Sequence, residues 1–143
     1  MERFLGRYSP YVYSILRIVA GFLFLLHGTQ KFFGFPPFPA GMQAPPMDSF
    51  MMALMTAAGA IELIAGLMII FGFYSSIAAF IASGEMAVAY FMVHQPMGAL
   101  PATNGGDAAV LFCFIFLYIA ARGSGNWSVD SAMGRNRPTA SDV

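Results

Sequence analysis

The stretch that decides the fold class is residues 10–33, PYVYSILRIVAGFLFLLHGTQKFF. It exceeds the roughly 20 apolar residues that a helix needs to cross the hydrocarbon core of a bilayer. A proline stands at a tolerated first-turn position, and the GFPP sequence of residues 34–37 breaks the helix at its other end. The N-terminal region has no Ala-x-Ala-like cleavage site, so we expect a retained membrane-spanning helix rather than a signal peptide.

Three more apolar blocks follow, at about residues 48–71, 75–94 and 106–122. Asp48 and Ser49 are favourable N-cap residues for the second block, and a short GFYSS turn at residues 72–76 joins it to the third. The sequence therefore predicts an all-α membrane four-helix bundle in a single domain, residues 1–143. A Pro-rich loop, residues 34–47, separates helices 1 and 2, and residues 123–143 form a polar C-terminal tail.

The composition points to lipid as the main partner of the chain. Of its 143 residues, 58% are hydrophobic and 10% are charged, whereas a soluble domain carries roughly 25% charged residues. The net charge is zero and no basic run is present, which argues against nucleic acid as a partner. The single cysteine, Cys113, excludes a disulfide framework and a Cys-x-x-Cys redox pair.

The distribution of basic residues predicts the orientation in the membrane. Five arginines flank the predicted bundle on one side: Arg3, Arg7, Arg122, Arg135 and Arg137. The two long loops on the other side carry no cation apart from Lys31 at the rim of the first span. Because cytoplasmic segments are enriched in Lys and Arg, we expect both termini in the cytoplasm and the Pro-rich loop outside.

Ionisable residues inside the spans are the candidates for function, since burying a charge in a bilayer costs at least a few kcal/mol. Glu62 and Glu85 fall near mid-membrane, and Arg17 lies about a quarter of the way in from the cytoplasm. An extended Arg side chain would reach the level of both glutamates, which predicts a central layer of two carboxylates and one guanidinium. This layer is either a structural polar core with one protonated glutamate or a proton-handling or ligand site.

A second predicted layer lies nearer the outer face and contains His27, Lys31, His94 and Asp107. Each member has a structural alternative: Lys31 snorkels to the interface, Asp107 complements the dipole of its helix, and His27 is a hydrogen-bonded core histidine. His27 and His94 would also be the first candidates for ligating a haem. Haem is the less favoured alternative because His94 points opposite Glu85 on an ideal helix.

Five segments together resemble the DoxX family of small four-helix membrane proteins. They are RIVAGFLFLLHGTQKFFG at 17–34, GAIELIAGL at 59–67, EMAVAY at 85–90, NGGD at 104–107 and GSGNWSVD at 123–130. The first is the most specific, with its Arg, His-Gly and Lys. Asp107 departs from the pattern, because the family usually has Glu after the two glycines.

The resemblance implies a protein of the bacterial inner membrane and leaves three functions open. The first is a membrane subunit associated with redox chemistry, like the small subunit of a thiosulfate:quinone oxidoreductase, with a quinone or similar molecule as ligand. The second is a non-enzymatic scaffold or chaperone for soluble redox enzymes, and the third is a small-solute or proton transporter. A redox partner protein, a homo-oligomer and catalytic activity of the chain itself stay open.

In the first of these hypotheses, the buried ionisable residues divide into two roles. Glu62 and Glu85 exchange protons, as the catalytic candidates. The ligand-binding candidates are Arg17, His27, Lys31, His94 and Asp107.

Overall fold

The computed structural model describes residues 1–37 and 47–135, and the regular structure within these ranges is entirely helical. The predicted all-α class is therefore confirmed. The centre of the predicted Pro-rich loop, including Pro39, Pro45 and Pro46, lies outside the described residues. So does the end of the predicted tail, which contains Arg137.

The first long helix begins after a short N-terminal segment. α1 spans Glu2–Leu5, the 3-10 turn η1 spans Gly6–Tyr8, and α2 spans Ser9–Phe33. Pro10 stands in the first turn of α2, where its missing N–H has no intrahelical partner to lose. Gly34 ends α2 in the left-handed conformation at φ 65°, which glycine adopts without steric cost.

The second and third long helices form the expected hairpin. α3 spans Ser49–Phe71, and the Asp48 carboxylate caps it by accepting a hydrogen bond of 2.8 Å from the Met51 amide. Gly72 ends α3 at φ 69°, and α4 begins after it, at Ser75–Ala89. The helical path then continues through a π-turn, η2 at Tyr90–His94, and a 3-10 turn, η3 at Gln95–Met97.

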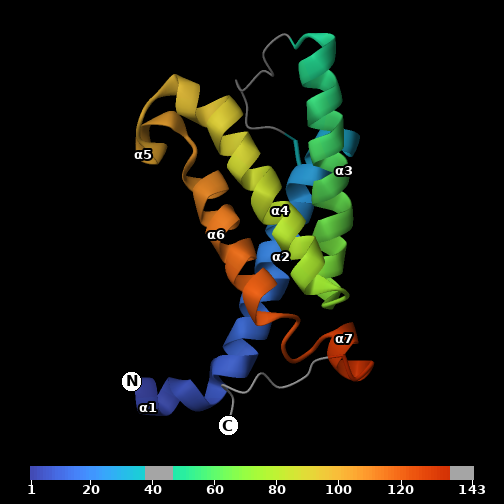
Figure 1. Ribbon diagram of the computed structural model, residues 1–143, viewed down its shortest axis with the longest axis vertical. Helices are drawn as coiled ribbons and strands as arrows, with labels where there is room; N and C mark the ends of the chain where they lie inside the picture. Colours follow the sequence, from blue (N-terminus) through green and yellow to red (C-terminus); the bar gives the residue numbers. More distant parts are fainter. Residues whose placement is uncertain (38–46, 136–143) are drawn as a thin grey trace.

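The C-terminal part contains one longer helix between two short ones. α5 spans Pro101–Asn104, α6 spans Asp107–Arg122, and α7 spans Val129–Ala132. Asp107 lies in the first turn of α6, where a carboxylate is stabilised by the helix dipole. Figure 1 shows that α7 and α1 lie at the same end of the molecule.

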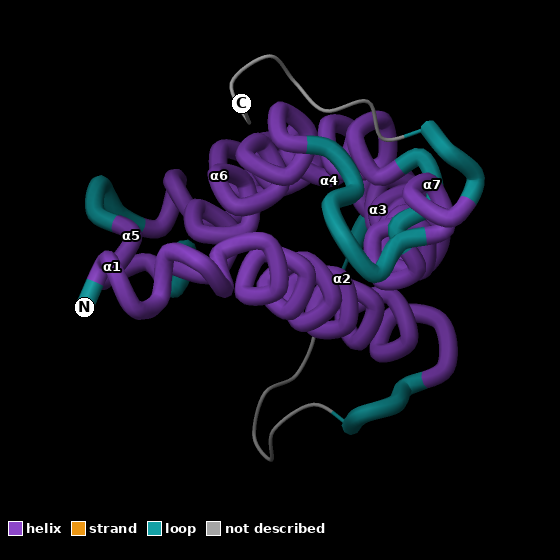
Figure 2. The backbone as a smooth tube through the Cα atoms, turned by 90° about the horizontal axis from the view of Figure 1, so that it is seen from below, coloured by secondary structure: helices purple, strands orange, loops and turns teal. Residues whose placement is uncertain are grey.

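The helices pack as two pairs, α2 with α3 and α4 with α6, and the α3–α4 hairpin connects the pairs. Figure 2 shows both pairs from below. Glycines set the close approach of α2 and α3, because small residues let two helix backbones come near each other. A Cβ atom on Gly28 would lie 2.8 Å from the Leu63 nitrogen, and one on Gly66 would lie 3.1 Å from the Leu25 Cα.

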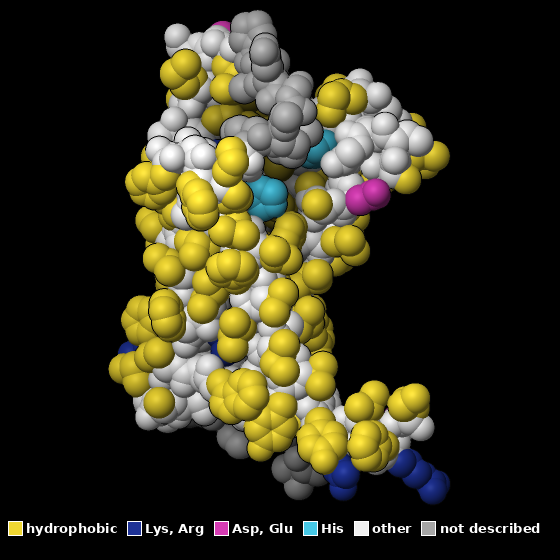
Figure 3. Space-filling view, turned by 180° about the vertical axis from the view of Figure 1, so that it is seen from behind, with side chains coloured by type: hydrophobic (Ala, Val, Ile, Leu, Met, Phe, Trp, Pro, Cys, Tyr) yellow, Lys and Arg dark blue, Asp and Glu magenta, His cyan; other side chains and the backbone are white. Residues whose placement is uncertain are grey.

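The outer surface of the helices suits a lipid environment. Among residues 1–37 and 47–135, three continuous helical runs are long and apolar enough to cross a membrane, by length and composition: Glu2–Phe33, Ser49–Phe71 and Ser75–Met97. Phe80 and Phe114 are examples of large apolar side chains that stay about two-thirds exposed. Figure 3 shows such side chains along the length of one face, with Lys and Arg side chains gathered in its lower half.

Candidate functional site

An ion pair connects the end of α2 to a buried glutamate of α3. The Lys31 Nζ atom lies 2.6 Å from Glu62 Oε1, with 26% of the lysine side chain and 2% of the glutamate side chain exposed. Gly59, one turn before Glu62, makes room for this approach, because a Cβ atom there would lie 3.3 Å from the Lys31 Cβ. Lys31 therefore neutralises a carboxylate, where the sequence left a choice between snorkelling and ligand binding.

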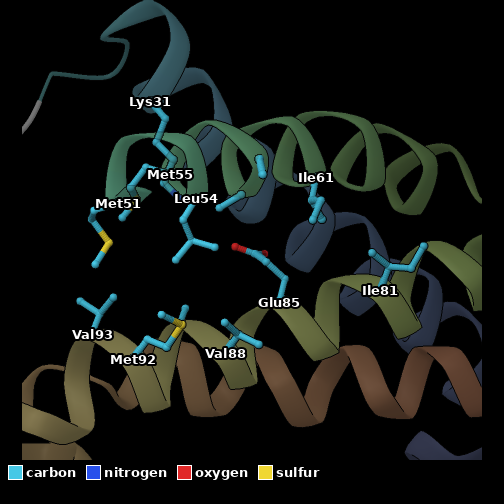
Figure 4. A pocket seen from close by; sticks show the side chains of 13 residues that line it. Lys31, Met51, Leu54, Met55, Ile61, Ile81, Glu85, Val88, Met92 and Val93 are labelled. Carbon is cyan, nitrogen blue, oxygen red and sulfur yellow. The ribbon is translucent and has the colours of Figure 1, made fainter. Parts of the chain in front are cut away.

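A cavity of about 230 Å³ lies beside this ion pair, between α3 and the α4–η2 helix. Its polar groups are the side chains of Lys31 and Glu85. The rest of its lining is apolar: Met51, Leu54, Met55, Ala57, Ala58, Ile61, Ile81, Val88, Ala89, Met92 and Val93. Figure 4 shows the Glu85 carboxylate projecting from α4 toward α3 among these side chains. The cavity thus combines long apolar walls with one ammonium and one carboxyl group.

The Lys31 ammonium forms an ion pair with Glu62, and no ion pair of Glu85 is present in the described part of the chain. Glu62 Oε2 and Glu85 Oε2 are both buried, and neither has a hydrogen-bond partner within the described part of the chain. A buried carboxyl group without partners is costly, and two adjacent carboxylates with one ammonium leave an excess negative charge. A ligand group or a proton at Glu85 would remove that cost. These are the two alternatives that the sequence left open, a ligand site and a polar core with one protonated glutamate.

Arg17 does not join this group, so the predicted layer of Arg17, Glu62 and Glu85 is wrong. The fully buried guanidinium donates hydrogen bonds to the carbonyl oxygens of Ile69, Ile70 (2.8 Å) and Trp127 (2.8 Å). Helical side chains lean toward the N-terminus of their helix, so Arg17 extends toward the cytoplasmic end predicted for α2 and away from the glutamates. The same rule directs Lys31 from the far end of α2 back toward Glu62.

The carbonyl partners of Arg17 belong to the last turn of α3 and to a folded segment, residues 123–130, which we call the C-terminal clasp. The Tyr13 hydroxyl donates to the Gly123 carbonyl, and the Ser14 hydroxyl donates to the Asn126 carbonyl at 2.7 Å. A Cβ atom on Gly72 would lie 2.2 Å from the Ser128 Cβ, so glycine is required where the clasp meets α3. The clasp thus packs against the ends of α2 and α3.

Asp130 completes the clasp and lies outside the helices that could span a membrane. It accepts a hydrogen bond of 2.5 Å from the Ser124 hydroxyl. Burial by itself would raise the pKa of the Asp130 carboxyl. The bond from Ser124, backbone hydrogen bonds from residues 74 and 75, and the Arg135 guanidinium outweigh burial and lower the pKa. The sequence showed residues 123–130 as a motif but assigned them no role, because a short polar segment has no hydrophobic period to locate it.

The predicted outer layer also separates into independent parts. His94 Nδ1 lies 3.2 Å from the carbonyl oxygen of Asn104, so this histidine contacts the last residue of α5. His27 is exposed, and its ring meets the Phe112 ring edge-on at 6.2 Å. Asp107 is exposed at the start of α6, as its structural alternative predicted. Of the four residues, Lys31 alone lines the cavity.

The comparison with known proteins agrees with the resemblance seen in the sequence. Residues 12–95, more than half of the chain, match the family described as DoxX. The chain belongs to the DoxX family. A relative of this DoxX protein was found in Haemophilus influenzae, where it is described as an uncharacterized protein. The two sequences are 39% identical over 130 residues, which cover 89% of this chain and 94% of the relative. No solved structure matches the chain. Family and apolar helices together make it a membrane protein.

Proposed function

We propose that this DoxX protein binds a quinone or a similar small lipid-soluble molecule in the cavity between α3 and α4, as a membrane subunit associated with redox chemistry. The observation that carries the proposal is the combination of apolar walls with Lys31 and Glu85 in one cavity. Ligand pockets are typically apolar with a few polar groups that fix the orientation of the ligand. A quinone has the matching shape, with an apolar ring and tail and two carbonyl oxygens.

The lining suggests how such a ligand would be held. Three methionines, Met51, Met55 and Met92, contribute flexible and polarisable side chains that adapt to an irregular apolar ligand. The Lys31 ammonium is already engaged with Glu62 at one oxygen and has further N–H groups to donate to a ligand carbonyl. Electrons for reduction of the ligand would come from a redox partner protein.

The proposal includes four crossings of the bacterial inner membrane, with both termini in the cytoplasm. α6 has 16 residues and rises about 24 Å, less than the roughly 30 Å hydrocarbon core, so α5 and the adjoining turn complete the fourth crossing. Three arginines support this orientation, because they lie next to helix ends on the side of the molecule that carries α1 and α7: Arg7, Arg122 and Arg135.

The test is calorimetric or fluorescence titration of the purified full chain in detergent with a short-chain ubiquinone analogue. Ala58→Phe places a large side chain in the cavity lining and should weaken binding at least tenfold. Ala53→Phe is the matched control, because Ala53 lies on the same helix, is exposed, and does not line the cavity. Saturable binding that is equal in both variants, or no saturable binding to the wild type, would refute the proposal. Mass spectrometry of co-purified lipid-soluble molecules would identify the natural ligand.

A further inference from the structure

The structure distinguishes the two glutamates that the sequence treated alike. Resting on the proposed function, we infer that Glu85 selects the ligand by donating the proton of its carboxyl group to a ligand carbonyl oxygen, while Glu62 is a positioning residue that holds Lys31 at the cavity. The site would therefore take neutral molecules with a carbonyl acceptor, such as quinones, and reject lipophilic cations. No covalent bond forms in this step; the proton stays shared between two oxygen atoms.

The first argument is the placement of the carboxyl groups. Glu62 is 2% exposed, contacts Lys31 at 2.6 Å, and is not part of the cavity lining. Glu85 lines the cavity, and its Oε2 atom is buried without a hydrogen-bond partner in the described part of the chain. Glu85 is therefore placed to contact a ligand in the cavity. Glu62 lies behind the cavity wall and is bound to Lys31 through one carboxyl oxygen, so it is placed to position that lysine.

The second argument is the charge balance of the three side chains. Lys31 carries one positive charge and already forms a short ion pair with Glu62. An ionised Glu85 would add an uncompensated negative charge between apolar walls, which is the arrangement that burial penalises most. A protonated Glu85 removes the excess charge and turns its free oxygen into a hydrogen-bond donor. Two donors, Lys31 and Glu85, then face the position of a ligand carbonyl.

The surroundings of Glu85 contain few other titratable groups. α3 contributes Glu62, and α2 contributes Lys31, with His27 one turn away but exposed beside Phe112. α6 packs on the other side of α4 and contributes Cys113, whose carbonyl accepts a hydrogen bond from Ser83. The charged residues of α6, Asp107 and Arg122, stand at its two ends. Glu62 and Lys31 are thus the groups that set the charge of Glu85.

This assignment makes ligand binding proton-linked in a defined direction. If only the protonated form of Glu85 binds, the apparent dissociation constant rises about tenfold for each pH unit above the point where the carboxyl loses its proton. Glu85→Gln keeps a donor group of nearly the same shape but cannot ionise. That variant should bind the ubiquinone analogue with an affinity that does not change with pH.

The experiment measures binding of the ubiquinone analogue and of tetraphenylphosphonium, a lipophilic cation, to the full chain between about pH 5.5 and 9. For the wild type we expect quinone affinity to fall at high pH, and for Glu85→Gln we expect a flat profile. Glu62→Gln should weaken binding at every pH by releasing Lys31. Glu2→Gln is the control, because Glu2 is exposed in α1.

Different failures separate the inference from the proposed function. Quinone binding that is independent of pH in the wild type, or equally pH-dependent in Glu85→Gln, would overturn the role of Glu85 and leave the cavity as a quinone site. Tetraphenylphosphonium binding that strengthens with pH and disappears in Glu85→Gln would replace the neutral ligand by a cation. Absence of saturable quinone binding at every pH would remove both the inference and the proposed function.

Discussion

The two cations of α2 lie toward opposite ends of the helix, and different kinds of groups compensate their positive charges. Arg17 is fully buried and is surrounded by backbone carbonyl oxygens from α3 and the C-terminal clasp. Lys31 is partly exposed, pairs with one of two glutamates, and borders a cavity. The partners of Arg17 are backbone carbonyl groups, which do not titrate, so this end of α2 is suited to stabilise the fold. The Lys31 end, with spare carboxyl oxygens, is suited to exchange ligands and protons.

The largest effect that would test this contrast is the loss of Arg17. Arg17→Ala should destabilise the protein by about 3 to 5 kcal/mol, because several buried carbonyl groups lose a charged donor. Thermal or denaturant unfolding in detergent measures the loss, with Arg3→Ala as a control at an exposed arginine. Adding Glu62→Gln should give no rescue, since Glu62 is paired with Lys31. Recovery in that double variant would restore the layer that the sequence predicted.

Loss of Lys31 should affect ligand binding more than it affects folding. Lys31→Met leaves Glu62 without its cation, but partial exposure of the site limits the destabilisation to about 1 to 2 kcal/mol. Binding of the ubiquinone analogue should weaken by about 1 to 3 kcal/mol through loss of a buried charged donor. Here a second change, Glu62→Gln, should recover stability but not binding. Equal loss of both properties in Lys31→Met and Arg17→Ala would remove the contrast between the two ends.

The clasp should also give the protein a measurable sensitivity to acid. The folded-state pKa of Asp130 is lowered, so its contribution to stability is fully present above the unfolded pKa and disappears as the pH falls through the folded value. Stability should therefore decline as the pH is lowered below about 4. Asp130→Asn should reduce this decline by lowering stability at neutral pH, because the variant lacks the carboxylate whose contribution the wild type loses only in acid. Unfolding curves of the wild type and the variant at neutral and at acidic pH provide the measurement. Asp107→Asn is the control, because Asp107 is an exposed acid.

The smallest effect is expected at His27. His27→Phe keeps the bulk of the side chain, and the ring is exposed and outside the cavity lining. Stability and affinity for the ubiquinone analogue should both stay within about 0.5 kcal/mol of the wild type. A loss of binding as large as that of Lys31→Met would mean that the ligand extends beyond the cavity toward α2 and α6. A Soret band in the purified protein would instead support the haem alternative.

Much of the fold could be predicted from local patterns. The Gly34 and Gly72 helix ends, the Asp48 cap and the α3–α4 hairpin all follow from residues close in sequence. Local signals failed where distant segments meet. The π-turn at Tyr90–His94 had no local signal, and residues 123–130 carry no hydrophobic period that would show their packing against α2. Lys31, Glu62 and Glu85 were all among the candidate residues predicted from the sequence. The sequence did not predict that Lys31, rather than Arg17, forms the ion pair with Glu62.

The sequence by itself determined that this protein is helical, lies in a membrane, belongs to the DoxX family and buries several ionisable residues. Apolar block length, glycine positions and the order of short motifs are properties of the chain and need no tertiary contact. Only the tertiary structure decided which cation meets which partner. That choice depends on how far α2 is shifted along α3, on the lean of helical side chains toward the N-terminus, and on the return of the C-terminal clasp to Arg17. The burial of apolar residues changes little when one helix shifts along another. The shift between α2 and α3 is therefore determined by the packing of their glycines and by the hydrogen bonding of buried polar groups.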